Sequence, residues 1–327
     1  MKTAVWAGLA AVLLTAGAEG WAAEGTTLHG WIVEWDAPAG LETLRAHSHR
    51  YDGVSIFGYQ FDGRGNLVPA NPELPALARE IRQQVPQTPL TLTVVNDVGN
   101  RYKDNQFIRR LLASTAARRR HIEQLVGLSR EYDGLEIDYE NYRKDSNPRD
   151  LQNFSDFIAE LKERLPAGKK LVVDVETDPQ VLDWKAISGA ADNLNVMAYY
   201  SHWAGSGPGA LCEFSLLEKI ARDINRQGVS PSKILVILPT HGFDWPQEGP
   251  GKQLEHEEAE ALRRREGSPP VRRDAEMNPY FTYTSEGKSH TVFYEDALSL
   301  KRKADKLREL GLTRIGLWRL GKGPADF

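Results

Sequence analysis

Three carboxylate side chains alternate along one short segment of the chain, Tyr132-Asp133-Gly134-Leu135-Glu136-Ile137-Asp138-Tyr139-Glu140. Successive side chains of a β-strand point to opposite faces, so Glu136, Asp138 and Glu140 share one face. Like charges a few ångströms apart cannot all ionise, and at least one carboxyl group is then driven towards its protonated form. A general acid at neutral pH requires such a protonated carboxyl group. The segment therefore predicts acid–base chemistry on one face of a strand.

The opposite face of the same segment is apolar, with Leu135, Ile137 and Tyr139. Alternation alone leaves two interpretations open: an amphipathic strand whose acidic face is simply exposed to solvent, or an acidic row that lines a site. Strands of a parallel sheet normally form an almost continuous apolar run. An acidic row in a parallel barrel therefore favours the second interpretation.

Eight short apolar runs, each followed by an amphipathic stretch, are the elements that must position this row. The runs lie at residues 28–35, 53–61, 90–95, 133–139, 171–175, 194–197, 234–238 and 315–317. Strands that alternate with helices pair in parallel through right-handed crossovers. Eight such units fit a (β/α)8 TIM barrel better than a doubly wound sheet, and no glycine-rich nucleotide-binding motif is present. We therefore expect an α/β fold of the TIM-barrel class.

A long polar stretch interrupts this alternation between Leu238 and Val292. It predicts a modest insertion, at about residues 246–291, in the seventh βα connection. The βα connections lie on the face where barrel active sites are built. We expect residues 23–327 to form a single barrel domain with this insertion.

The first residues are typical of an export signal. Lys2 precedes a short apolar run from Ala4 to Leu14, and Gly20 and Ala22 suit cleavage after residue 22. The run is too short to span a bilayer, which needs about 20 residues. We predict a signal peptide at residues 1–22, with a buried N-terminal helix as the alternative, and a secreted or periplasmic monomer without a membrane span.

Composition excludes several classes of function. The 327 residues include 41 Lys and Arg against 45 Asp and Glu, and a net charge of −4 argues against a nucleic-acid partner.

His202 and His241 show no zinc-binding spacing and are interpreted as hydrogen-bonding loop residues, so we predict no metal and no cofactor. Cys212 is the single cysteine and is interpreted as a packed thiol rather than a nucleophile.

Four segments resemble, in order, the motifs of family 18 glycoside hydrolases, the chitinase family. Residues 133–140 resemble D-G-x-D-x-D-x-E, Met197-Ala198-Tyr199 resembles M-x-Y-D, residues 237–245 resemble G-L-P-x-Y-G-x-x-W, and residues 316–321 resemble G-x-x-W-x-L-G. Residues 281–283 and 292–296 also resemble the branch related to spore-cortex lytic and germination hydrolases. The resemblance covers nearly all of residues 23–327.

The resemblance implies a role for each matching residue. Glu140 matches the general acid, Asp138 the carboxylate that orients the N-acetyl group of the substrate, and Tyr199 the phenol that bonds the acetamide carbonyl. Trp318 matches the aromatic floor under the cleaved sugar. In this family the acetamide oxygen of the substrate acts as nucleophile, which retains the anomeric configuration. The implied substrate is a polysaccharide with β-linked N-acetylglucosamine, of chitin or peptidoglycan type.

Two residues depart from the family pattern. Glu136, which we include in the catalytic set, stands where Asp is usual, and Tyr200 stands where an Asp usually follows the motif tyrosine. The second change puts the choice of substrate in doubt more than acid catalysis. Further residues are predicted to bind substrate, with core packing as the alternative for the two tryptophans: Met197, Trp245, Tyr59, Trp203, Asn96 and Asp97.

Alternatives to a glycosidase remain open. A non-catalytic, chitinase-like sugar-binding barrel would keep the groove without the chemistry. Glu136, Asp138, Asp174 and Glu176 could instead ligate a divalent metal for metal-assisted hydrolysis. Inward-facing Asp174 and Glu176 would also give an acidic mouth suited to partly deacetylated, cationic glucosamine chains, unless they pair with nearby basic side chains.

Overall fold

The computed structural model describes residues 26–142 and 146–324. The predicted signal peptide, residues 1–22, lies outside the described residues.

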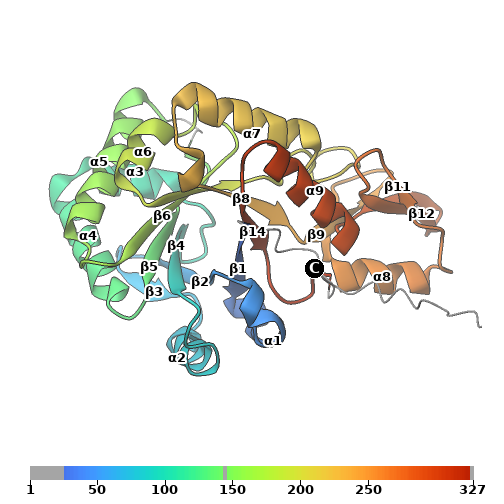
Figure 1. Ribbon diagram of the computed structural model, residues 1–327, viewed down its shortest axis with the longest axis horizontal. Coiled ribbons are helices and arrows are strands. Elements are labelled where there is room, and N and C mark those ends of the chain that lie inside the picture. Colours follow the sequence, from blue (N-terminus) through green and yellow to red (C-terminus); the bar gives the residue numbers. More distant parts are fainter. Residues whose placement is uncertain (1–25, 143–145, 325–327) are drawn as a thin grey trace, which may run out of the picture.

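Eight parallel strands close into a barrel, which confirms the predicted TIM-barrel class (Figure 1). The barrel closes because the first strand pairs with both the second and the last. A short strand, β3 (Leu67–Pro69), adds antiparallel to β2 outside this ring. Each barrel strand coincides with one predicted apolar run: β1 (Thr27–Val33), β2 (Gly53–Phe61), β4 (Leu90–Val98), β5 (Gly134–Asp138), β6 (Lys170–Val175), β7 (Asn193–Met197), β8 (Ile234–Pro239) and β14 (Arg314–Trp318).

Helices cover the outside of the barrel. They are α1 (Ala37–His47), α2 (Leu74–Gln84), α3 (Asn105–Ala113), α4 (Thr115–Ser129), α5 (Pro148–Arg164), α6 (Trp184–Ala190), α7 (Phe214–Gln227) and α9 (Ala297–Glu309). The local sequence explains α5 well. Asn147 and Asp150 form a capping box around Pro148, and Phe154 and Phe157 bury one stripe of the helix against the sheet.

Two apolar clusters define the inside and the outside of the barrel wall. The main core contains the outward strand residues and the helix stripes, with Leu135 and Ile137 fully buried. A smaller cluster, with Trp31 and Met197 among its members, fills the barrel interior and is capped by Tyr199 and Trp318. Apolar packing inside the barrel therefore ends in aromatic side chains towards its C-terminal mouth.

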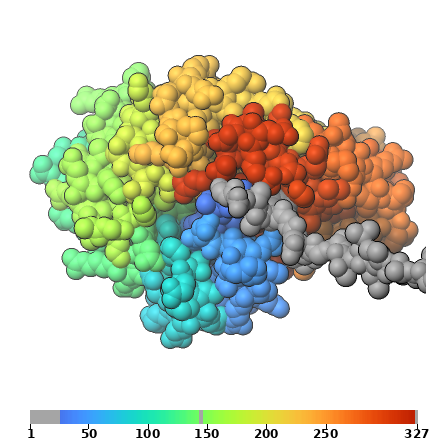
Figure 2. Space-filling model, in the orientation of Figure 1, coloured from blue at the N-terminus to red at the C-terminus, as the bar shows by residue number. Residues whose placement is uncertain are grey.

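The interruption in the seventh βα connection is a small antiparallel sheet with one helix. Its strands pair in the order β10-β9-β13-β12-β11, and together with α8 they form a lobe at one end of the molecule (Figures 1 and 2). The elements are β9 (His241–Pro246), β10 (Lys252–Glu255), α8 (His256–Arg265), β11 (Arg272–Arg273), β12 (Pro279–Ser285) and β13 (Lys288–Phe293).

The antiparallel sheet begins earlier than the predicted insertion at residue 246. Strand β9 starts at His241, and Thr240 alone separates it from the end of β8 at Pro239. Gly242 permits the close approach of β13 to β9, because a Cβ atom there would lie 2.2 Å from the carbonyl oxygen of Phe293. A segment assigned from sequence to the end of a barrel strand therefore belongs to the second sheet.

A buried histidine joins helix α4 to the carboxylate strand and predicts a pH dependence of stability. Nε2 of His121 lies 2.8 Å from the Tyr139 hydroxyl, and burial lowers the pKa of His121 to about 3. The unfolded chain takes up this proton near pH 6.5, whereas the folded chain does not until about pH 3, so His121 costs stability as the pH falls through that window. We expect the free energy of unfolding to fall less steeply from pH 6.5 to 4 in His121→Phe than in wild type, measured by urea denaturation. Parallel pH profiles would contradict this assignment, whatever the absolute stability of the variant.

Candidate active site

The acidic row faces the barrel interior, as the alternation predicts. Strand β5 ends at Asp138, which places Glu136 and Asp138 inside the barrel and Glu140 at its C-terminal mouth. The side chains on the opposite face of the strand, Leu135 and Ile137, are buried in the main core. The strand thus holds its carboxyl groups at increasing height along the barrel axis.

Glu136 lies at the bottom of the site and is fully buried. Its Oε2 accepts hydrogen bonds from Trp31 Nε1 at 3.0 Å and Thr93 Oγ1 at 2.6 Å, and its Oε1 accepts one from Asn195 Nδ2 at 2.7 Å. These donors come from β1, β4 and β7. Three bonds to a buried carboxyl group suit a positioning role beneath the reacting atoms.

Asp138 and Asp174 are buried next to each other and next to Glu136. Burial raises the pKa of Asp138 well above its usual value, and the neighbouring Glu140 adds to the shift. Burial, then Glu136, does the same for the pKa of Asp174, whose Oδ1 accepts a hydrogen bond from Asn195 at 2.9 Å. Both groups therefore favour the protonated form, so the mouth is less negative than its number of acidic residues suggests.

One oxygen of Asp138 is available to a ligand. Among the described residues, its buried Oδ1 has no hydrogen-bond partner. Buried polar atoms are normally paired, and an unpaired one at a site indicates a partner that arrives with the ligand. This matches the role that the resemblance implies for Asp138, a contact with an N-acetyl group.

Glu140 is held at the mouth by its backbone and by both of its carboxylate oxygens. The buried Asn96 side chain accepts from Glu140 N at 3.2 Å and donates to Glu140 O at 3.1 Å. Tyr200 Oη donates to Oε2 at 2.9 Å, and Lys103 Nζ lies 2.5 Å from Oε1. Asn96, predicted to bind substrate, here fixes the backbone of Glu140.

Lys103 comes from the loop after β4 and was not predicted from the sequence. Its backbone adopts a positive φ of 50°, and its N–H donates to Asp97 Oδ1 at 2.7 Å. Burial alone would lower the pKa of Lys103, but the charge of Glu140, the neighbouring Tyr102, the hydrogen bond to Glu140 and the nearby Asp138 together outweigh burial, and the pKa is raised. No motif marks this loop lysine, and only the pairing of β4 with β5 brings it to Glu140.

Tyr199, Met197 and Trp318 lie together, as the resemblance implies for the sugar-binding site. Tyr199 and Trp318 are the partly buried caps of the inner apolar cluster that contains Met197. Burial, and then the neighbouring Tyr200, raises the pKa of Tyr199 well above its usual value, which keeps its phenol a hydrogen-bond donor. The Trp318 ring packs edge-on against Phe57, with centroids 5.1 Å apart.

Trp245 and Tyr59, predicted to bind substrate, lie in packed surroundings instead. Trp245 is 2% exposed between Leu211 and Phe243, and its Nε1 donates to the carbonyl of Trp203 at 3.2 Å. Tyr59 belongs to the main core. The pairing of β2 with β4 shifts register around Gly58, whose φ is 142°, so the chain beyond this irregularity no longer follows the alternation of the earlier residues.

Exposed aromatic side chains surround the mouth. Trp35 follows β1, Tyr102 follows β4, and Tyr200 and Trp203 follow β7. Trp35 packs edge-on against Phe57, which continues the contact to Trp318. Amphipathic rings at the wet end of a barrel are suited to stacking on sugars. Trp35 and Tyr102 were missed from the sequence because nothing local distinguishes an exposed aromatic from a buried one.

The described residues show no arrangement of three or more His, Cys, Asp or Glu side chains that could hold a metal ion. His241 is buried and burial lowers its pKa to about 4, while His202 Nδ1 lies 2.8 Å from the Gly207 carbonyl oxygen. Cys212 is fully buried, and burial raises the pKa of its thiol. None of the helices in the described ranges is both long and apolar enough to cross a bilayer.

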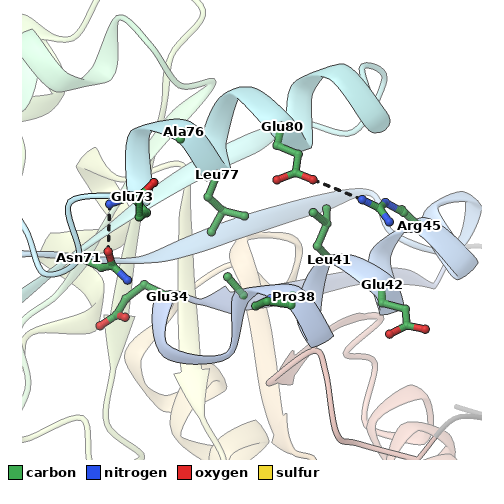
Figure 3. A pocket seen from close by; sticks show the side chains of 11 residues that line it. Glu34, Pro38, Leu41, Glu42, Arg45, Asn71, Glu73, Ala76, Leu77 and Glu80 are labelled. Atoms are coloured by element: carbon green, nitrogen blue, oxygen red, sulfur yellow. Dashed lines mark hydrogen bonds and ion pairs between the residues drawn. The ribbon is translucent and has the colours of Figure 1, made fainter.

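A separate groove of about 570 Å³ lies between α1 and α2 (Figure 3). Its apolar floor includes Leu41 and Leu77, and its rim includes the Arg45–Glu80 ion pair. No predicted catalytic or substrate-binding residue lines it. The candidate active site is therefore the barrel mouth around Glu140.

Comparison with known proteins agrees with this geometry. The model of the glycosyl hydrolases family 18 matches residues 78–323, which include the carboxylate strand, Tyr199 and Trp318. The chain belongs to this family. The match runs through the segments that contain all four short motifs, so the resemblance is not a coincidence of isolated motifs.

The chain is similar to spore-related enzymes of Bacillus and to chitinases. YdhD of Bacillus subtilis (strain 168), named as a sporulation-specific glycosylase, is 28% identical over 297 residues, which cover 86% of this chain and 69% of YdhD. A cortical fragment-lytic enzyme of Bacillus anthracis is 25% identical over 71% of this chain, which spans only 57% of that enzyme. The crystal structure of a chitinase from Chromobacterium violaceum superimposes with a TM-score of 0.81 at 25% identity, and covers 92% of this chain and 96% of the chitinase.

Proposed function

We propose that this family 18 protein is an exported glycosidase that cleaves β-linked N-acetylglucosamine polysaccharide, of chitin or peptidoglycan type, with retention of configuration. The observation that supports it most is the arrangement around Glu140. A carboxyl group stands at the mouth, Asp138 lies below it with an oxygen that has no partner among the described residues and a pKa that burial raises, and Tyr199 and Trp318 lie alongside.

The proposed reaction assigns one task to each group. Glu140 in its acid form gives its proton to the glycosidic oxygen as the bond from the anomeric carbon breaks. The acetamide oxygen of the same sugar attacks the anomeric carbon from the other side and forms an oxazolinium ring. Asp138 and Tyr199 hold the acetamide in position, which is a positioning and electrostatic contribution. Water activated by the Glu140 carboxylate then opens the ring and restores the proton to Glu140.

The protonation of the buried acids bears on the choice of substrate. Because Asp138 and Asp174 favour the neutral form, the mouth is not the strongly anionic surface that their number would suggest. Selection of a cationic, partly deacetylated chain therefore has no particular support from these residues. The names of two relatives, a cortical fragment-lytic enzyme and a chitinase, point to spore cortex and to chitin, so both acetylated glycan classes belong in the proposal.

Product analysis tests the proposal. The chain from residue 23 would be incubated with N-acetylglucosamine oligomers and with purified peptidoglycan, and the products read by mass spectrometry and by NMR of the fresh anomeric centre. We expect shortened oligomers with N-acetylglucosamine at the new reducing end, initially in the β configuration. Inverted products would exclude the acetamide mechanism.

Two outcomes of the same experiment would favour the alternatives. Tight binding without products would favour a sugar-binding barrel. The specific observation in favour of that alternative is that Tyr200 stands where the family usually has Asp. Activity lost in a chelator and restored by a divalent cation would favour metal-assisted hydrolysis. Export would be tested separately, by the N-terminal sequence of the protein recovered outside the cytoplasm.

A further inference from the structure

Both oxygens of Glu140 are occupied by donors within the chain. Lys103 Nζ lies 2.5 Å from Oε1, and Tyr200 Oη lies 2.9 Å from Oε2. The side chains of Lys103 and Glu140 are 18% and 13% exposed, so the ion pair is largely shielded from water. A general acid needs one oxygen protonated and directed at the leaving group. One of the two donors must therefore be replaced when substrate binds.

The two donors hold different oxygens of Glu140 and come from different loops. Tyr200 belongs to the Tyr199 side, because the two rings are 5.1 Å apart and Tyr200 Oη is 3.9 Å from Met197 Sδ. That is the side assigned above to the cleaved sugar and its acetamide. Lys103 reaches Glu140 from the β4 loop instead. Lys103 therefore holds the oxygen that Tyr200 does not, and in the proposed reaction we assign that oxygen to the leaving sugar.

The loop that presents Lys103 is internally bonded, so the ammonium moves by side-chain rotation. Asp104 N donates to the Asn96 carbonyl at 2.9 Å, and Arg101 pairs with Asp104 at 2.5 Å. The Lys103 backbone is held by Asp97, as described above. The ammonium also lies 4.8 Å from the centre of the exposed Tyr102 ring, so a cation–π contact accompanies the ion pair with Glu140.

We propose that Lys103 selects a glycan whose leaving-group sugar bears a carboxylate. This inference rests on the proposed function, and it names the substrate class of that same site. The carboxylate of the leaving sugar takes the ammonium from Glu140, and Glu140 takes up one proton from solvent. The charges balance, because the Lys103–Glu140 pair becomes a Lys103–substrate pair and a neutral acid. A hexosamine with a 3-O-lactyl ether, as in muramic acid, has this chemistry.

The other acidic and phenolic groups around the ammonium do not compete with such an anion for its charge. Asp97 is engaged by the backbone of Lys103. Asp138 favours its neutral form, because burial raises its pKa. Glu176 Oε1 accepts a hydrogen bond from Asn141 N at 2.7 Å, and Tyr200 is a neutral phenol donor. Glu140 is thus the carboxylate that directly pairs with the ammonium, and its protonation leaves Lys103 as a cation available to the substrate.

The test compares two substrates that differ by one charge. One is the peptide-free tetrasaccharide of alternating N-acetylglucosamine and N-acetylmuramic acid, and the other is the same compound with each lactyl carboxyl group converted to its methylamide. We expect wild type to cleave after N-acetylglucosamine, with kcat/KM about tenfold or more higher for the carboxylate form, since charge-assisted hydrogen bonds are the strong ones. The preference should shrink as salt is raised.

Variants locate the effect. In Lys103→Met the ratio of the two kcat/KM values should fall to about 1, whatever the absolute rates, and Lys103→Arg should keep part of the preference. Lys252→Met, at an exposed position of β10, is the matched control and should keep the wild-type ratio.

Three results would overturn the inference: equal rates for the two substrates in wild type, an unchanged ratio in Lys103→Met, or muramic acid at the new reducing end. In each case cleavage of N-acetylglucosamine tetramer by wild type would leave the proposed function standing. Failure to cleave any of the three oligomers would overturn the proposed function, and the inference with it.

Discussion

Glu140→Gln is expected to lower kcat/KM for N-acetylglucosamine oligomers by about 10²–10⁴-fold, the usual contribution of a general acid. The amide can still accept the hydrogen bond from Tyr200, and the backbone bonds to Asn96 are untouched, so the fold should persist. Steady-state kinetics would measure the loss, and thermal unfolding would check the fold.

The dependence on leaving group separates acid catalysis from a purely structural effect. When the aglycone of an aryl glycoside is a strongly acidic phenol, it departs without being protonated. Glu140→Gln should therefore lose much less activity on such a glycoside than on the oligomers. Glu131→Gln is the matched control, because Glu131 is an exposed glutamate that lies shortly before the start of the same strand, β5. An equal loss on both substrate types would contradict the role of Glu140 as the acid.

Lys303→Met is expected to destabilise the protein by about 3–5 kcal/mol, the cost of breaking a buried ion pair. Lys303 Nζ lies 2.8 Å from Glu295 Oε2, and the two side chains are 0% and 1% exposed. The ammonium also bonds Asn278, just before β12, so it connects α9 to the antiparallel sheet. Removing it leaves Glu295 buried with the hydroxyl of Ser299 as a donor at 2.6 Å. Urea denaturation would measure the change.

A second variant and the pH dependence test the cause. The double substitution Lys303→Met with Glu295→Gln should recover a large part of the loss, because no unpaired charge remains. Burial already raises the pKa of Glu295. In Lys303→Met the carboxyl group of Glu295 keeps a raised pKa in the folded chain, which favours folding at low pH. The loss in free energy of unfolding relative to wild type should therefore grow as the pH rises.

Lys301→Met on the same helix serves as the control for Lys303→Met. Its ammonium pairs at 3.2 Å with Asp305 four residues on, and the lysine side chain is 44% exposed. Such pairs are worth about 0.3–0.5 kcal/mol. Similar losses at positions 301 and 303 would show that burial of the pair is not what matters.

The sequence by itself determined the barrel and the orientation of the carboxylate strand. Period-2 alternation is a local property of the chain, so it correctly placed Glu136 and Asp138 inside and Leu135 and Ile137 outside. The eight apolar runs were equally local. The same reasoning could have found Asn195, because it alternates with Leu194 and Val196 in β7.

The tertiary structure alone decided which side chains meet. Trp31 and Glu136 are 105 residues apart yet hydrogen-bonded, and Lys103 reaches Glu140 from a loop with no motif. The pairing of β9 with β13, which needs Gly242 at its closest approach, placed β9 in a second sheet, and Trp245 on β9 is buried there. Local geometry fixes which way a side chain points within its own strand. Its partners depend on how distant strands and loops close around it, and the periodicity of one segment holds no information about that closure.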